Sequence, residues 1–232
     1  TLLFAFISVP ISTIIALLIS VGLNSIKALQ KAYQTIFFLP YLTNALAIGA
    51  VFATMFSIIS PTGTAEGAYS LGLINKILGT SINWTSISPE NIWANRFVVI
   101  IYEIWAGLPF KILILFGALQ NVNKQYYDAA KVDGANRFTT LMKITVPLIS
   151  PMLSYLIITG FIGGFKAYTA VVGIYGAEKV SNSYINTMVG YIYDQIGNDS
   201  TGLAAAGALI LFGIILVFTL INLAVSKKKV HY

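Results

Sequence analysis

The sequence contains no cysteine, a single histidine (His231, beside the C-terminus) and only 9% charged residues among its 232 positions. The absence of cysteine excludes disulfide frameworks, thiolate nucleophiles and Cys-ligated metals. One late histidine argues against a His-based zinc site and against a Ser-His-Asp triad within this chain. The scarcity of charge is equally informative, because about a quarter of the residues in a typical soluble domain are charged.

Hydrophobic residues make up 57% of the chain. A water-soluble globule of this length could not bury so much apolar surface, so we expect the surplus to face lipid. A helix needs about 20 mostly apolar residues to cross a hydrocarbon core of about 30 Å. Five stretches meet this requirement, at roughly 2–23, 35–57, 94–120, 147–169 and 203–225.

Each apolar stretch must be helical, because lipid offers no partners for the backbone N–H and C=O groups. A transmembrane β-barrel would instead show many alternating segments of about ten residues. The sequence therefore predicts an all-α, polytopic membrane protein that forms a transmembrane helix bundle. The chain begins inside an apolar run, without a methionine or a signal peptide. From this we expect that an upstream segment is missing, one further helix being the simplest case.

The basic residues predict the orientation of the chain in the membrane. With the C-terminus inside, nine of the fourteen Lys and Arg residues fall on cytoplasmic segments: Lys27, Lys31, Lys124, Lys131, Arg137, Lys143 and Lys227–Lys229. The opposite loops hold Lys76 and Lys179 beside the acidic residues Glu66, Glu90, Glu178, Asp194 and Asp199. The positive-inside rule then favours a cytoplasmic C-terminus. The net charge of +6 is thus explained by topology, and no nucleic-acid partner is expected.

Helix-disturbing residues lie inside the predicted spans at Pro40, Pro109 and Gly163-Gly164. One interpretation is close packing and kinks within a bundle. The other is that breaks at these residues open the backbone to a translocation path, as broken helices do in transporters. The residues alone leave both interpretations open.

The segment 121–146, between the third and fourth predicted spans, reads as a short helix, a glycine stop and a second helix. Asn123 is a suitable N-cap, with Asp128 expected early in the helix that follows. Ala129 and Ala130 are small, so another surface can approach the backbone. Gly134 can take the left-handed conformation that ends a helix, and Pro147 suits the first turn of the next membrane helix.

Three parts of this segment match a known pattern: Tyr127-Asp128-Ala129-Ala130, Asp133-Gly134-Ala135 and Ile144-Thr145-Val146-Pro147. They resemble the EAA loop of permease subunits of bacterial ATP-binding-cassette (ABC) importers, which have a MetI-like domain. The departure is Asp128, where the family usually has Glu. The resemblance implies that residues 1–232 form one transmembrane domain, and that its loop docks in a groove of a separate ATPase. The docking residues would be Tyr127, Asp128, Ala129, Ala130, Asp133, Gly134, Ala135 and Phe138. The alternative is an ordinary amphipathic loop on the membrane surface.

Further segments resemble the carbohydrate-importing branch, such as the first permease of maltose and oligosaccharide importers. They are Phe37–Pro40, Trp105–Phe110, Leu119–Val122, Tyr191–Tyr193 and Gly202–Ala206. After Tyr168 the usual Leu-Thr-x-Gly-Gly-Pro-type turn is absent, which leaves the subfamily open. The resemblance implies a substrate path along Glu103, Gly107, Phe110, Gly164, Phe165, Lys166 and Tyr168.

Ionisable groups at membrane depth are costly and normally face a partner or a wet cavity. Glu103 and Lys166 therefore either bind a polar glycan or pair with each other or with a partner subunit, and Lys166 can also snorkel to the outer interface. Lys111 is expected to be paired or to reach an interface rather than to contact substrate. In the outer loop, Leu73, Ile74, Ile77 and Leu78 predict a short surface helix within 72–79, used for packing or for docking a solute-binding protein.

The family resemblance implies a multi-pass permease of the bacterial plasma membrane that translocates a sugar or oligosaccharide by alternating access. Its expected partners are a second homologous permease, two ATPase subunits, an extracellular solute-binding protein and membrane lipid. No phosphate-binding G-x-x-x-x-G-K-[ST] sequence is present, so we expect this chain to be no enzyme and to hold no cofactor, with ATP and Mg on the partner ATPase. The alternatives are an ABC permease for another solute (a polyamine, phosphate or an amino acid) and an ion-coupled secondary transporter.

Overall fold

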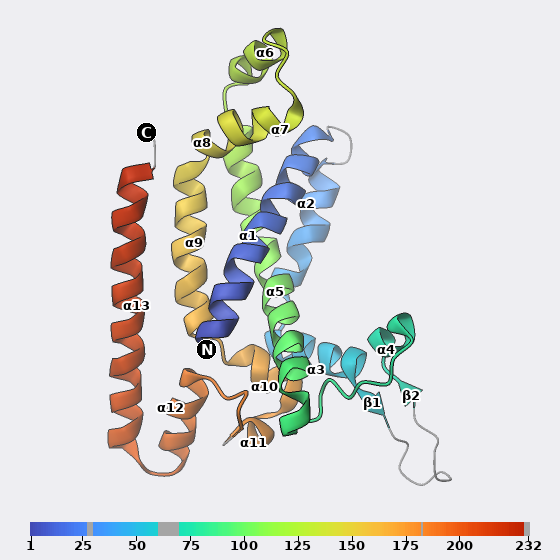
Figure 1. Ribbon diagram of the computed structural model, residues 1–232, viewed down its shortest axis with the longest axis vertical. Coiled ribbons are helices and arrows are strands. Elements are labelled where there is room, and N and C mark those ends of the chain that lie inside the picture. Colours follow the sequence, from blue (N-terminus) through green and yellow to red (C-terminus); the bar gives the residue numbers. More distant parts are fainter. Residues whose placement is uncertain (27–29, 60–69, 182, 230–232) are drawn as a thin grey trace. The chain divides into compact units, whose positions relative to one another are not determined.

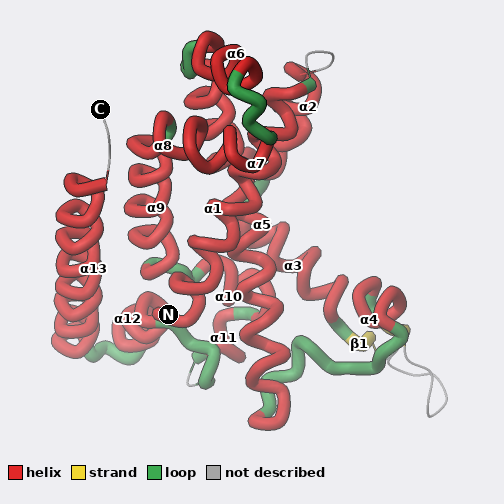
Figure 2. Tube along the Cα trace, turned by 45° about the horizontal axis from the view of Figure 1, so that its top comes forward, coloured by secondary structure: helices red, strands yellow, loops and turns green. Residues whose placement is uncertain are grey.

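The computed structural model describes residues 1–26, 30–59, 70–181 and 183–229, and these are overwhelmingly helical (Figure 2). A short antiparallel ladder joins β1 (Ile58–Ile59) to β2 (Ser70–Leu71), with Ile58 opposite Leu71 and Ile59 opposite Ser70. The predicted all-α class is confirmed. Lys27, Glu66 and His231, on which predictions above depend, lie outside the described residues.

Three helices of the described chain are long and apolar enough to cross a membrane, and up to five spans result if each of two bent helix pairs is one span. The long helices are α1 (Leu2–Ser25), α5 (Ile92–Gln120, preceded by η2, Pro89–Asn91) and α13 (Thr201–Lys229). The first bent pair joins α2 (Gln30–Phe38) and η1 (Leu39–Leu42) to α3 (Ala45–Phe56). The second joins α7 (Arg137–Thr140), η3 (Leu141–Thr145) and α8 (Val146–Leu148) to α9 (Ser150–Phe165).

The stretch expected as one helix over 35–57 is broken near Pro40. Helix α2 ends at Phe38, and Pro40 lies in the 3-10 turn that follows. Asn44 then starts α3 by accepting hydrogen bonds from the amides of Leu46 (2.9 Å) and Ala47 (3.3 Å). Proline removes a helical N–H and an Asn cap favours a new start, so the two residues together explain the break. By contrast, α5 continues through Pro109.

The membrane helix after the loop begins later than Pro147, contrary to expectation. Pro147 lies in the three-residue helix α8, and the chain bends by 73° before α9, which starts at Ser150. Pro147 and Pro151 are four residues apart, and each removes a backbone donor from the helical ladder, which explains a bend between them. Helix α9 also ends at Phe165, before the expected boundary at 169, and α10 (Thr169–Tyr175) follows.

The chain divides into two compact units, each described by itself. Unit 1 comprises Thr1–Ser8, Thr43–Ile104 and Gly163–Phe212, and unit 2 comprises Val9–Leu42, Trp105–Ile162 and Gly213–Tyr232. In unit 1, α3 packs on α10, and Gly49 meets the backbone of Gly173. Unit 1 also holds α11 (Ala177–Val180) and α12 (Met188–Gly197).

A polar network in unit 1 fixes the predicted outer loop. Asn75 and Asn95 are fully buried. The Asn75 amide oxygen accepts from the Trp84 indole N–H (2.9 Å), and the Asn95 side chain donates to the Trp84 carbonyl. The predicted surface helix is confirmed as α4 (Leu73–Leu78), which ends at a left-handed Gly79. Leu73, Ile77 and Leu78 stay more than half exposed, so this chain does not itself bury them.

Unit 2 is built around an apolar core from α1, α5 and α9. Leu115, Phe116, Ile149 and Leu156 are almost completely buried there, among neighbours that include Ala16. Figure 1 shows α7, α8 and the further short helix α6 (Lys124–Val132) gathered at one end of this unit. The residues predicted to meet an ATPase all lie in this terminal group.

Candidate functional site

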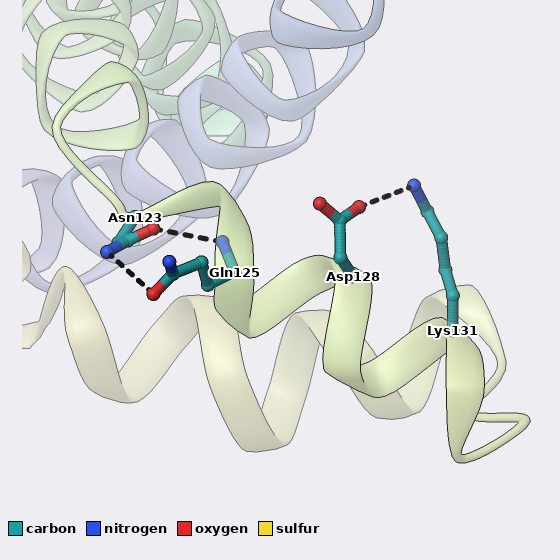
Figure 3. Close-up of polar contacts among 4 residues, drawn as sticks. All are labelled: Asn123, Gln125, Asp128 and Lys131. Carbon is teal, nitrogen blue, oxygen red and sulfur yellow. Dashed lines mark hydrogen bonds and ion pairs between the residues drawn. The ribbon is translucent and has the colours of Figure 1, made fainter.

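The candidate coupling loop begins at Asn123, which caps α6 as predicted. Its side-chain oxygen accepts a 2.9 Å hydrogen bond from the Gln125 amide, and its NH₂ group donates to the Gln125 side chain at 3.4 Å (Figure 3). Such a cap satisfies one of the amides that a helix start leaves without a partner. Because α6 starts at Lys124, Asp128 is in its second turn, and the expectation that Asp128 lies early in the helix is wrong.

Asp128 forms an ion pair with Lys131 on α6, with 3.3 Å between the carboxylate oxygen and Nζ. The two side chains are 54% and 75% exposed and extend from the same side of the helix (Figure 3). An exposed pair of this kind stabilises the fold by at most about 1 kcal/mol. Both groups can therefore exchange this contact for one with a partner at small cost.

The end of α6 is a Schellman motif around Gly134. The Ala135 amide donates to the Ala130 carbonyl (2.9 Å), and the Gly134 amide donates to the Lys131 carbonyl (3.1 Å). Gly134 has φ +69°, the left-handed conformation predicted for it, and Asp133 is the C-cap residue. This pattern satisfies the last carbonyls of the helix and turns the chain sharply. The loop therefore contains a turn whose shape is defined by backbone hydrogen bonds.

The two alanines of the motif point to opposite environments. Ala130 is only 4% exposed, whereas Ala129 is exposed. Tyr127 is half-buried, and its hydroxyl accepts a 3.4 Å hydrogen bond from Thr145. Tyr127 and Ala130 therefore face the chain's own structure, and Ala129 is the small residue that faces outward. A protein that docks on this helix would contact Ala129 rather than the side chain of Ala130.

Apolar side chains on and beside α6 and α7 are left exposed, at 53% for Tyr126, 88% for Val132, 71% for Phe138 and 50% for Met142. The second helix, α7, is fixed by Asn136, whose side chain accepts from the Thr139 amide at 2.7 Å. Exposed apolar groups that lie together are typical of interaction surfaces. Of these four residues, only Phe138 is among the predicted docking residues.

The predicted path residues of unit 1 lie in different surroundings. Glu103 is half-buried on α5, and Gly164 is buried on α9. Phe165 is 1% exposed and packs edge-on against Phe6, with ring centroids 6.2 Å apart. Lys166 is exposed just beyond α9.

Tyr168, the remaining path residue of unit 1, stacks on Tyr193, with ring centroids 4.8 Å apart. In the sequence, Tyr193 belongs to a segment that resembles the carbohydrate-importing branch, and it is not among the predicted path residues.

The predicted path residues of unit 2 lie on α5. Phe110 stacks on Tyr41 (ring centroids 5.8 Å apart), and Tyr41 stacks on Phe38 (5.3 Å). Gly107 lies beside Ser12, whose hydroxyl would be 3.6 Å from a Cβ at this position. Among the residues that the structure describes, no group of three His, Cys, Asp or Glu side chains is placed to hold a metal ion.

Lys111 is buried at 6% exposure in unit 2, and its ammonium donates to the Val9 carbonyl (3.2 Å) and to the Ser12 hydroxyl (2.5 Å). The prediction that Lys111 is paired is confirmed in the sense that it is hydrogen-bonded within the chain.

The apolar helices of membrane-crossing length and the capped loop between α5 and α9 define an integral membrane protein of the helix-bundle class. The family model of the binding-protein-dependent transport system inner membrane component matches residues 2–231, and the chain belongs to this family. The predicted membership among permeases of ABC importers is thereby confirmed.

Two relatives illustrate the family. The probable ABC transporter permease protein MG188 of Mycoplasma genitalium is 31% identical over 90% of this chain and 61% of its own length. The arabinooligosaccharides transport system permease protein AraP of Halalkalibacterium halodurans is 30% identical over 96% of this chain and 68% of its own length. The chain thus spans roughly two thirds of each relative.

Among solved structures, the chain resembles one from a bacterial ABC transporter involved in the import of the acidic polysaccharide alginate. The TM-score is 0.74 at 22% sequence identity, over 98% of this chain and 76% of the other. This likeness supports the fold.

Proposed function

We propose that this chain is the transmembrane permease subunit of an ABC importer that translocates a sugar or oligosaccharide by alternating access. The likeness to AraP, a permease for arabinooligosaccharides, supports the substrate class. Family membership supports a role as a membrane component that itself catalyses no reaction.

One observation carries the proposal: an exposed helical turn, closed by its own hydrogen bonds, lies between two membrane helices. The Schellman motif at Gly134 fixes α6 against the start of α7, and Tyr127 and Ala130 anchor it inward. Outward it offers Ala129, the Asp128–Lys131 pair and the exposed apolar side chains of Val132 and Phe138. A rigid turn transmits a push from a docked ATPase to α5 and α9, whereas a flexible loop would absorb it.

The ATPase that docks here supplies ATP and Mg, because this chain has no phosphate-binding loop. The complete importer comprises this chain, a second homologous permease, two ATPase subunits and an extracellular solute-binding protein. Tyr127, Asp128, Ala129, Ala130, Asp133, Gly134, Ala135 and Phe138 form the coupling contact or position it. Val132 and Met142 extend this contact, because both are exposed beside these residues.

The coupling loop lies on the cytoplasmic side, as does the C-terminus. Lys124, Lys131, Arg137 and Lys143 give the loop four cationic groups against the carboxylates of Asp128 and Asp133. An excess of cationic groups is the property that keeps a loop in the cytoplasm. Since the chain has no cysteine, one cysteine introduced at Lys124 reports the side directly: a membrane-impermeant maleimide should label it only in inverted vesicles.

The residues proposed for the sugar path are Glu103, Gly164, Lys166 and Tyr168 in unit 1, and Gly107 and Phe110 in unit 2. Phe165 supports this path from within the core, because its ring is buried against Phe6. Aromatic faces and a few placed polar groups are the elements of a binding site for a polar ligand with apolar faces.

The test is uptake in proteoliposomes that hold this chain with its partner subunits. Labelled arabinotriose is supplied with the solute-binding protein outside and ATP inside. Uptake that requires both the binding protein and ATP supports the proposal. Uptake of a polyamine, phosphate or an amino acid but of no sugar contradicts the substrate class. Sugar uptake driven by an ion gradient without ATP contradicts the mechanism.

A further inference from the structure

A compact cluster in unit 1 joins the chain after α9 to helix α12. The rings of Tyr168 and Tyr193 stack at 4.8 Å with an interplanar angle of 22°. At the next residue of α12, the Asn186 amide donates a 2.7 Å hydrogen bond to the Asp194 carboxylate. Two consecutive residues of α12 are thus both held by the segment 168–186.

Gly190 makes this close approach possible. A Cβ added to Gly190 would lie 2.0 Å from the Asn186 side-chain oxygen and 3.4 Å from Cδ2 of Tyr168. The Gly190 amide is bonded in turn to the Thr187 hydroxyl (3.2 Å), which caps α12. Because each member is fixed by another, the tyrosine pair and the Asn–Asp pair have a defined relative position.

The cluster is nevertheless open to the outside. Tyr193 is 55% exposed, although one face of its ring is covered by Tyr168. Asp194, Asn186 and Tyr168 are half-buried. A charged carboxylate with an amide neighbour lies beside a large aromatic face, on a segment that contains few other charges.

We infer that Tyr193, Tyr168, Asp194 and Asn186 form a carbohydrate contact site on α12. The inference rests on the proposed function, from which it takes the substrate class. The open face of the Tyr193 ring packs against the C–H face of a sugar ring. The Asp194 carboxylate and the tyrosine hydroxyls exchange hydrogen bonds with the sugar hydroxyls, which present both donors and acceptors. The prestacked tyrosines lose little side-chain entropy when the sugar binds.

Asn186, Tyr193 and Asp194 lie within 170–202, the part of the chain that the positive-inside rule places outside the membrane, and Tyr168 lies at the outer end of the preceding predicted span. A sugar released from the solute-binding protein meets this cluster before it enters the membrane. Helix α12 is therefore a first contact for the sugar.

The experiment measures uptake by the reconstituted importer as a function of the concentration of sugar-loaded binding protein. Labelled arabinotriose and maltotriose are the probes. Tyr193→Ala removes the ring face and should raise the half-saturating concentration about tenfold, the equivalent of about 1.4 kcal/mol. Tyr193→Phe keeps the ring face but loses the hydroxyl, so it should show a smaller loss than Tyr193→Ala. Asp194→Asn keeps an acceptor for Asn186 and should show a smaller, intermediate loss.

Tyr191→Ala is the matched control, because Tyr191 is a 39% exposed tyrosine of the same helix outside the cluster. ATPase activity without binding protein confirms that each variant assembles. The inference is overturned if Tyr193→Ala and Tyr191→Ala behave alike while the original protein imports either probe. It is also overturned if Tyr193→Ala only prevents the second permease from co-purifying, since Tyr193 is then a subunit contact. If the original protein imports neither sugar and imports another solute, the proposed function falls and the inference with it.

Discussion

Gly49 and Gly173 meet backbone to backbone where α3 crosses α10. A Cβ on Gly49 would lie 2.6 Å from the carbonyl carbon of Gly173, closer than any real side-chain contact. No flexible side chain can move aside there, so the helices themselves must separate to admit a methyl group. The first prediction follows from this contact.

Gly49→Ala should lower the free energy of unfolding by about 1–3 kcal/mol, the usual cost of overpacking a tight contact. Gly117→Ala is the control, because nothing lies within 4 Å of a Cβ there, and alanine favours the helix. Thermal unfolding in detergent should therefore show a lower midpoint for Gly49→Ala and an unchanged or higher one for Gly117→Ala. Equal midpoints would show that α3 and α10 do not depend on this contact.

The second prediction concerns the left-handed turn at Gly134. Gly134→Ala should strain the turn by about 1–2 kcal/mol, because an L-residue with a Cβ disfavours a φ of +69°. Gly134→Asn should be milder, because asparagine tolerates this conformation. We expect ATPase co-purification and ATP-driven uptake to fall in the order glycine, asparagine, alanine, with unchanged membrane insertion. If Gly134→Ala keeps full ATPase co-purification and full ATP-driven uptake, the left-handed turn is not needed for coupling.

Local rules predicted the parts of the fold that depend on neighbouring residues. The Asn123 cap, the left-handed Gly134 and the surface helix α4 were all predicted, because a cap or a stop acts over a few residues. The start of the fourth membrane helix was misplaced by three residues. Pro147 and Pro151 are four residues apart, and either can lie in the first turn of this helix. Local sequence preferences do not decide between the two starting points.

Features that depend on tertiary packing were not predictable in the same way. The sequence does not show that Ala130 turns inward while Ala129 turns outward, because that depends on tertiary packing such as the contact of Tyr127 with Thr145. The stack of Tyr168 on Tyr193 joins residues far apart in the sequence. Only the position of α12 in the fold brings Tyr193 against Tyr168, and no local sequence rule gives that position.

The third prediction concerns the buried ammonium of Lys111. Lys111→Met keeps most of the side-chain volume but removes the hydrogen bonds to Val9 and Ser12. The Val9 carbonyl retains the Thr13 hydroxyl as a donor at 2.7 Å, so the expected loss of stability is modest, about 1–2 kcal/mol. The half-saturating sugar concentration should not change, because Lys111 is inside the helix packing. A change of fivefold or more would place Lys111 in the substrate path.

The fourth prediction is a loss of stability at alkaline pH. Burial raises the pKa of Tyr175 above its ordinary value, and burial likewise raises the pKa of Tyr184. Both hydroxyls are hydrogen-bonded to Asn95, Tyr175 to its carbonyl at 3.1 Å. The unfolded chain ionises its tyrosines near pH 10, whereas the folded chain keeps these two protonated. Their contribution is therefore complete below about pH 10 and is lost as the pH rises further.

Unfolding in denaturant between pH 8 and pH 11 tests this point. The decline above about pH 10 should be shallower in Tyr175→Phe, which cannot ionise at this position. Tyr126→Phe is the control, since Tyr126 is 53% exposed on the loop. Identical pH profiles for the two variants would contradict a role for the buried tyrosine network in alkaline unfolding.

The fifth prediction tests the path through Glu103, a half-buried carboxylate on α5. An ionisable group within a membrane span is expensive to maintain, and contact with a polar substrate is one reason to keep it. Glu103→Gln preserves the shape and removes the charge, and should raise the half-saturating sugar concentration about tenfold while ATPase activity persists. Glu90→Gln is the matched control, because it also removes one negative charge, at an exposed site before α5. It should leave the half-saturating sugar concentration unchanged. If Glu103→Gln has unchanged uptake kinetics but a lower unfolding midpoint, Glu103 pairs with another group within the importer and does not bind the sugar.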